Sequence, residues 1–144
     1  GMAGGQALDL AALGRQLSIE EVETVHSRKT GALIRACVMM GAACSPEIAP
    51  TTRIALDEYA TAVGLAFQIQ DDLLDVEGDP TLLGKATGAD SALNKPTYPA
   101  VAGVERARER VRTLHERALR ALARTPLRTD SLVAMSNWLV LRRH

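Results

Sequence analysis

Three aspartates and a glutamine share one predicted helix face in the segment from Gln68 to Asp75, which reads QIQDDLLD. Residues 68, 71, 72 and 75 are spaced i, i+3, i+4 and i+7, and side chains at this spacing project from the same side of an α-helix. Residues 54–84 hold seven acidic side chains and no Lys or Arg. Because like charges at helical spacing repel each other, Asp71, Asp72 and Asp75 favour a bound cation, and clustered carboxylate oxygens suit Mg²⁺.

The alternative interpretation of this segment is a solvated polar face on an amphipathic helix. An apolar stripe formed by Leu56, Tyr59, Ala60, Val63 and Phe67 lies opposite the acidic face, as that interpretation requires. Short acidic patterns are common in proteins, so the segment alone does not decide between a metal site and a wet surface. The flanking residues must decide.

Lysine is rare in this chain, and its positions favour a site. Only Lys29, Lys85 and Lys95 are lysines among the 17 basic residues. Two of them follow the acidic segment in a Gly-rich stretch, and Lys29 interrupts an otherwise apolar helical run. An ammonium group is a compact point charge. Carboxylates that hold a metal, with lysines that neutralise the outer oxygens, would complete a diphosphate site.

Two other phosphate or metal motifs fail on inspection. A P-loop over this stretch requires Gly at 79 and Ser or Thr at 86, where the chain has Asp79 and Ala86. A calcium-binding EF-hand loop starting at Asp75 requires Gly at 80, where the chain has Pro80. The histidines at 26, 115 and 144 are scattered without metal-ligand spacing, so no ligand role is assigned to them.

Composition indicates an all-α protein. Apolar residues make up 47% of the 144 residues and aromatic residues only 3%, and no run alternates with the period of a strand. Net charge is zero, so no global field draws the chain to nucleic acid. No apolar run approaches the length of a membrane span, and no signal peptide is evident, so the cytoplasm is the expected location. Cys37 and Cys44 are expected to be buried, reduced thiols.

Five helices are expected, and a long loop separates the third from the fourth. Ser18 and Glu21 form a predicted capping box, Thr51 or Thr52 is expected to cap the third helix, and Asp130 the last. Gly64 lies one turn before Gln68, where it would admit either a ligand or a closely packed helix. The expected helices span residues 3–14, 18–44, 51–76, 99–124 and 130–141, with the loop at 77–97.

Four ordered blocks in this sequence resemble the C-terminal half of trans-prenyltransferases of the polyprenyl diphosphate synthase family, specifically the bacterial farnesyl diphosphate synthase type. Together the blocks are far more specific than any one of them, and they span nearly the whole chain. They are GGQALD at 4–9, KTGALI at 29–34, GLAFQIQDDLLD at 64–75, and the GK, GAD and KPTYP elements between 84 and 99.

The resemblance implies a bundle of helices around a central cavity, here an incomplete isoprenoid-synthase-type bundle, commonly assembled as a homodimer. It implies that an allylic diphosphate, dimethylallyl or geranyl diphosphate, is condensed with isopentenyl diphosphate to give farnesyl diphosphate. Mg²⁺ ions held between two aspartate-rich motifs, together with lysines, stabilise the charge that develops on the leaving diphosphate.

Site roles are carried over motif by motif. Asp71, Asp72 and Asp75 would be the second aspartate-rich motif and bind Mg²⁺, Asp71 most directly. The resemblance implies that Gln6 and Asp9 support the metal cluster, Asp9 also as a ligand, and that Lys29 and Lys85 contact the diphosphate. It implies that Thr30 and Gln68 line the allylic tail or stabilise the cation. Lys95 would be a charge on the closing loop, and Arg142 and Arg143 would belong to a basic tail that covers the site.

The first aspartate-rich motif of the family is expected upstream of Gly4. Residues 1–144 are therefore expected to be the C-terminal part of a single prenyltransferase domain, to expose one apolar wall of its cavity and to be inactive in isolation. Product length depends on residues before that first motif, so it is not predicted.

Two alternatives to the enzyme interpretation remain. One is a non-catalytic regulatory or interaction subunit that partners a full-length synthase, which an intact gene for these residues alone would favour. The other is a terpene cyclase, against which the intact Asp71-Asp72-Leu-Leu-Asp75 argues, because cyclases normally carry a mixed metal motif at this place.

Overall fold

The computed structural model of the protein describes residues 1–77 and 96–142. The described residues form helices joined by short connections and include no strand, which confirms the predicted all-α class. The helices are α1 (Met2–Ala11), α2 (Ile19–His26), the π-helix η1 (Ser27–Gly31), α3 (Ala32–Ala43), α4 (Pro50–Glu77), α7 (Tyr98–Ala102), α8 (Val104–Ala123) and α9 (Asp130–Leu141).

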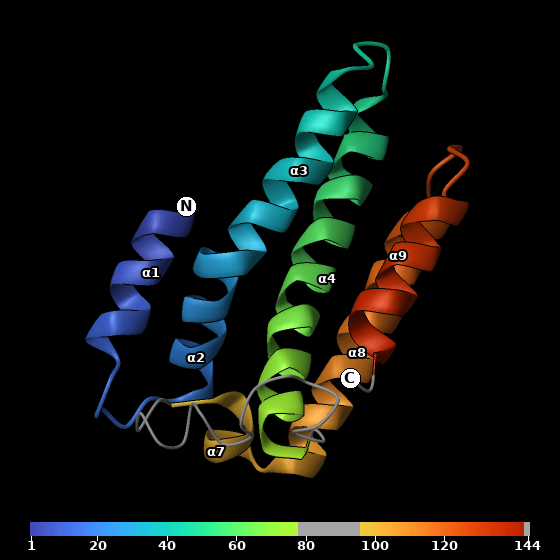
Figure 1. Ribbon diagram of the computed structural model, residues 1–144. Helices are drawn as coiled ribbons and strands as arrows, with labels where there is room; N and C mark the ends of the chain where they lie inside the picture. Colours follow the sequence, from blue (N-terminus) through green and yellow to red (C-terminus); the bar gives the residue numbers. More distant parts are fainter. Residues whose placement is uncertain (78–95, 143–144) are drawn as a thin grey trace.

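The long helix α4 is the centre of the arrangement. The continuous rod formed by α2, η1 and α3 lies along one side of it, and α8 and α9 lie along the other (Figure 1). α1 stands at the outer edge beside α2, and α7 lies near the C-terminal end of α4. The predicted site residues on the rod, Lys29 and Thr30, and those on α4, Gln68 and Asp71, are therefore placed by how α4 packs against the rod.

The core follows the apolar stripe predicted for α4. Leu56, Tyr59, Ala60 and Val63 are all buried, and the side chains of α8 pack against them. The Tyr59 hydroxyl donates a hydrogen bond of 2.8 Å to the carbonyl of Leu132, and burial raises the Tyr59 pKa to about 12. This bond satisfies the polar end of a buried ring and fixes α9 against α4.

The rod begins as predicted and then departs from a regular α-helix. The capping box is present: the Glu21 amide donates to Ser18 Oγ at 3.2 Å, and the Ser18 amide donates to Glu21 Oε2 at 2.8 Å. Residues 27–31 adopt a π-helix, in the middle of the α-helix expected over 18–44. Such π-helical turns are rare and occur frequently at functional sites.

Glycines bring three backbones together at this π-helix. A Cβ atom on Gly64 of α4 would lie 2.8 Å from the Cα atom of Gly31, and a Cβ atom on Gly5 of α1 would lie closer than 3.0 Å to the backbone of Arg28 and Lys29. Close helix packing is therefore the reason for Gly64, one of the two alternatives that the sequence left open.

Several element boundaries correct the predictions. The helix expected over 99–124 is two helices, because Gly103 adopts a φ of 86° that ends α7 and begins α8. α4 begins at Pro50, ahead of the predicted threonine caps. Thr129 precedes α9, and Asp130 lies in its first turn. The expected loop at 77–97 lies mostly outside the described residues.

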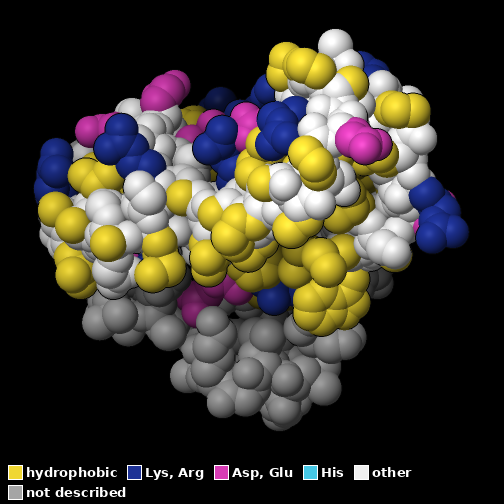
Figure 2. Space-filling model, turned by 90° about the horizontal axis from the view of Figure 1, so that it is seen from above, with side chains coloured by type: hydrophobic (Ala, Val, Ile, Leu, Met, Phe, Trp, Pro, Cys, Tyr) yellow, Lys and Arg dark blue, Asp and Glu magenta, His cyan; other side chains and the backbone are white. Residues whose placement is uncertain are grey.

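Surface exposure corrects a further prediction. Cys37 of α3 and Cys44 at its C-terminal end are both exposed free thiols instead of buried ones. Large apolar side chains are also exposed, including Met40, Met135 and Trp138. Figure 2 shows hydrophobic side chains gathered over much of the face seen from above. An exposed apolar face agrees with the expectation of an incomplete bundle.

Arginines from other helices balance the acidic residues of α4. Arg35 pairs with Asp57 at 2.5 Å, and Arg108 pairs with Glu77 at 2.7 Å. Glu58 pairs with Arg117 of α8 and with Arg124 directly after it, and these contacts lower the Glu58 pKa, that of Arg124 most strongly. Residues 54–84 contain no Lys or Arg, but arginines from other parts of the chain pair with several acidic residues of α4 in the folded protein.

Within the described ranges, no helix has both the length and the apolar character needed to cross a membrane.

We expect Gly64→Ala to lower the free energy of unfolding by about 1–3 kcal/mol, because the added methyl group would overpack the contact with Gly31. Gly41→Ala in α3 is the matched control, since nothing lies within 4 Å of its added methyl group. There the higher helix propensity of Ala should raise the free energy by about 0.5–1 kcal/mol. Urea titration followed by circular dichroism measures both, and a gain of stability at Gly64 would contradict the close packing.

Candidate diphosphate-binding site

Lys29 and Thr30 lie within η1, between α1 and α4. Both residues are half-buried. The Lys29 ammonium group pairs with Asp9 Oδ2 of α1 at 2.5 Å, and both side chains are largely shielded from solvent. The close approach of Gly5 to the backbone of Lys29 sets α1 near enough for this ion pair. The structure thus brings together two of the predicted site residues, and Gln6, on the same helix, is exposed.

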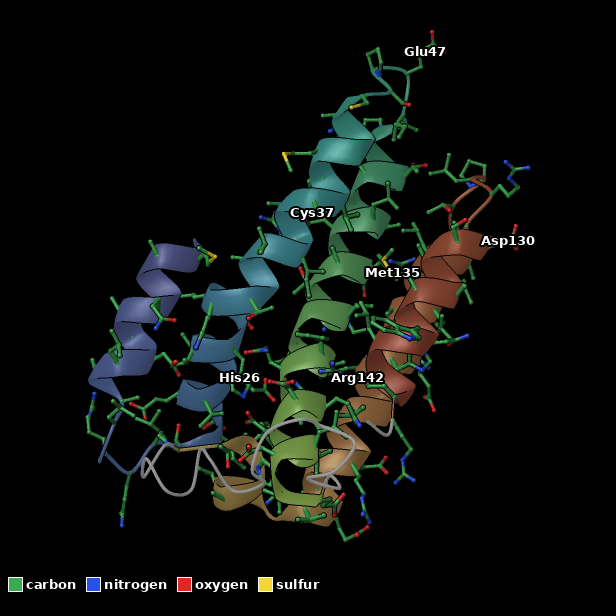
Figure 3. The ribbon with its side chains drawn as sticks, viewed as in Figure 1. His26, Cys37, Glu47, Asp130, Met135 and Arg142 are labelled. Atoms are coloured by element: carbon green, nitrogen blue, oxygen red, sulfur yellow. The ribbon has the colours of Figure 1, made fainter. Side chains whose placement is uncertain are left out.

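Asp71 and Gln68 lie on α4, one turn apart and both partly exposed. Asp71 Oδ1 accepts a hydrogen bond of 2.9 Å from the Arg142 guanidinium group, which lies 4.6 Å from the centre of the Phe67 ring. The side-chain amide of Gln70 also donates a hydrogen bond of 2.9 Å to the backbone carbonyl of Arg142. The predicted basic tail residue Arg142 therefore reaches the aspartate-rich segment, and Figure 3 shows Arg142 between α4 and α9.

Asp72, unlike Asp71, points into the interior of the protein. It is only 4% exposed. Its Oδ2 atom lies 2.9 Å from His26 Nε2 and accepts a hydrogen bond of 2.7 Å from the Tyr98 amide. His26 is equally buried and is the functional candidate that sequence reasoning missed, since nothing in the spacing of the histidines linked it to a residue 46 positions away.

Asp75 is buried at 3% exposure, although it shares the helix face of Asp71. Across residues 1–77 and 96–142, no three carboxylate, imidazole or thiol groups converge as a metal site would require. Mg²⁺ nevertheless commonly uses only one or two carboxylates and completes its shell with waters and substrate phosphates. The half-exposed Asp71 carboxylate fits that manner of binding. The metal role of the aspartates stays a prediction.

Lys85, Lys95 and Arg143, predicted to contact substrate, lie outside the described residues, so their places relative to Lys29 and Asp71 are not defined.

A polar network supports the helices behind the candidate site. Arg110 of α8 donates two hydrogen bonds to Glu23 of α2, at 2.8 and 2.9 Å, and the Tyr98 hydroxyl lies 3.4 Å from the same carboxylate. The bonds to Glu23 raise the Arg110 pKa, and burial followed by the charge of Glu23 raises the Tyr98 pKa. This network ties α2, α7 and α8 together below η1.

The cavity between α1 and α2 is separate from these residues. It has a volume of about 230 Å³ and is largely apolar, with Leu8, Ala12, Leu17 and Val25 among its lining residues. None of the predicted site residues lines it. Arg15, Glu20 and Glu21 also line it, but Lys29 of η1 and Asp71 of α4 do not, so this pocket is not assigned to the candidate site.

Comparison with known proteins identifies related sequences and folds. Residues 1–133 match the polyprenyl synthetase family. The chain is 47% identical over 145 residues to farnesyl diphosphate synthase of Escherichia coli, covering 99% of this chain and 48% of that protein. It is 41% identical over 144 residues to farnesyl diphosphate synthase of Haemophilus influenzae, with the same coverage.

A solved structure shows the same fold. Heptaprenyl diphosphate synthase of Staphylococcus aureus superposes with a TM-score of 0.91 at 19% identity, over 99% of this chain and 57% of that one. The chain spans about half the length of the curated relatives that it matches.

The contact between Arg142 and Asp71 should contribute measurably to stability. We expect a double-mutant cycle of Arg142→Ala and Asp71→Asn to give a coupling free energy of about 0.5–1 kcal/mol, because both side chains are partly shielded. The exposed pair Arg112–Glu109 is the control and should couple by less than about 0.5 kcal/mol. Denaturant unfolding measures both cycles, and equal coupling in the two pairs would show that the Asp71 contact has no special weight.

Proposed function

The chain belongs to the polyprenyl synthetase family, and from this premise we propose that it forms part of a farnesyl diphosphate synthase-type prenyltransferase. The proposed reaction condenses an allylic diphosphate with isopentenyl diphosphate in isoprenoid biosynthesis. The observation that carries the proposal is the close likeness, over nearly the whole chain, to a protein named farnesyl diphosphate synthase. Residues 1–144 would be the C-terminal part of the prenyltransferase domain.

Charge complementarity supports a diphosphate as the ligand. Lys29 offers an ammonium group from η1, held near α4 by the glycine contacts on both sides. Lys29 pairs with Asp9. A diphosphate would compete with Asp9 for Lys29, and charge-assisted hydrogen bonds of this kind are the strong ones.

Asp71 is the residue best placed to hold Mg²⁺, with Asp75 one turn further along the same face. When bound, the ion would neutralise charge on the diphosphate oxygens. Arg142 donates to Asp71 Oδ1, so a bound ion would share the carboxylate with this guanidinium group or displace it. The polar side chains of Thr30 and Gln68, both partly buried, would then border the allylic end of the substrate.

The remaining expectations belong to this proposal. A homodimer and a cytoplasmic location follow from the family resemblance. The large exposed apolar side chains are consistent with a partner surface, either the rest of the domain or a second copy.

Activity should appear only when the chain is joined to a complementary half. We expect a chimera in which residues 1–144 replace the 145 matched residues of the E. coli farnesyl diphosphate synthase to produce farnesyl diphosphate from geranyl and isopentenyl diphosphates. Purified residues 1–144 alone should produce none.

Radiolabelled product analysis measures both proteins. Product from the 144-residue chain alone would overturn the expected inactivity. A folded but inactive chimera would favour the non-catalytic subunit instead.

Lys29 should dominate binding of the diphosphate group. We expect Lys29→Gln to weaken binding of inorganic diphosphate in the presence of Mg²⁺ by about tenfold or more, because a charged hydrogen bond is lost. Arg120→Gln, on the exposed side of α8, removes the same charge elsewhere and should change the affinity less than about twofold. Isothermal titration calorimetry gives both values, and equal losses would mean that only net charge matters.

A further inference from the structure

The interaction between His26 and Asp72 joins the two walls of the candidate site. His26 ends α2 and lies three residues before Lys29, and Asp72 directly follows Asp71 on α4. Each of the two paired side chains is 5% exposed, and their polar atoms lie 2.9 Å apart. Figure 3 shows His26 on the helix that runs beside α4. The pair therefore links the helix that carries Lys29 to the helix that carries Asp71.

The Oδ2 atom of Asp72 has two hydrogen-bonding partners. The same oxygen faces His26 Nε2 and accepts from the Tyr98 amide at the first residue of α7. The Tyr98 side chain returns to Glu23, which lies one turn before His26 on α2. Asp72 Oδ2 thus has partners from both α2 and α7, and a buried carboxylate needs such partners to offset the cost of its burial.

The position of Asp72 on the helix determines where Asp71 points. Consecutive residues of an α-helix are rotated by about 100°, so a buried and bonded Asp72 directs Asp71 to a different side of α4. Asp71 is then turned toward the surface, where its side chain is 47% exposed. The two adjacent aspartates have different environments and, by the same reasoning, different tasks.

We propose that His26 is a positioning residue that acts through Asp72. In this proposal, Asp72 serves as the anchor of α4 and not as a metal ligand, while Asp71 carries the metal contact. The inference rests on the proposed function for its ligand, although the pair itself is defined by the fold alone. It differs from the expectation that all three aspartates bind Mg²⁺.

Conservative and disruptive substitutions separate the two roles of an aspartate. Asp72→Asn keeps an acceptor oxygen and removes the charge, whereas Asp72→Leu removes both. For an anchor, we expect Asp72→Asn to weaken Mg²⁺-dependent binding of inorganic diphosphate less than threefold and Asp72→Leu more than tenfold. Asp71→Asn should weaken it more than tenfold, with only the small fall in melting temperature that loss of the Arg142 contact brings. A loss in Asp72→Asn that equals the loss in Asp71→Asn, without a fall in melting temperature, would overturn the proposal.

His26 offers a matching pair of substitutions. The Gln side-chain amide can place a donor near the position of Nε2, so His26→Gln should retain diphosphate affinity within threefold of wild type. His26→Leu fills similar space without a donor and should lose more than tenfold. Calorimetry on the 144-residue chain, with circular dichroism to establish that each variant is folded, supplies these values. Equal affinity in folded His26→Leu and wild type would refute the positioning role.

A spectroscopic measurement on the wild-type chain tests whether the His26–Asp72 hydrogen bond is present, even if a variant fails to fold. A carboxylate acceptor requires a proton on His26 Nε2, so nitrogen-15 spectra of the ring should show Nε2 protonated at neutral pH. An unprotonated Nε2 would contradict the pair. Absence of diphosphate binding by the wild-type chain, with Nε2 protonated, would instead contradict the proposed function and leave the His26–Asp72 anchor standing.

Discussion

Direct contact between backbones at η1 is the constraint on which the arrangement of the site depends. Gly5 of α1 and Gly64 of α4 approach this π-helix from two sides, at distances that no β-carbon would allow without a shift of the chain. No side chain lies between the backbones at such a contact, so no change of rotamer can alter their spacing. The positions of α1, η1 and α4 along one another are therefore fixed where they touch. Lys29 and Thr30 lie in the segment that is held, so their backbones keep fixed places relative to α1 and α4.

Charge pairing then determines which acidic groups stay available. Arginines of α3 and α8 neutralise Asp57, Glu58 and Glu77 along α4. Asp72 is satisfied inside the protein by His26 and the Tyr98 amide. Asp71 keeps a half-exposed carboxylate whose partner, Arg142, belongs to the end of the chain. Among the described acidic residues of α4, Asp71 therefore keeps the most exposed side chain.

Local signals in the sequence predicted much of this structure. The capping box at Ser18, the apolar stripe of α4 and the helical class all depend on residues within a few turns of one another. The π-helix was missed because the side-chain pattern of one wider turn is almost that of an α-helix. The break at Gly103 was missed because a single glycine can also be tolerated within a helix. His26 and Asp72 meet only through tertiary packing, which no spacing along the chain reveals.

The central claim is that η1 and the exposed aspartate of α4 form one diphosphate site, and spectral mapping tests it most directly. Amide chemical shifts of the 144-residue chain would be recorded before and after addition of inorganic diphosphate and Mg²⁺. The account predicts that the largest changes fall on residues 29–30 and 68–72, in two segments that are distant in sequence. Changes confined to the arginine-rich helix α8, or no changes at all, would contradict it.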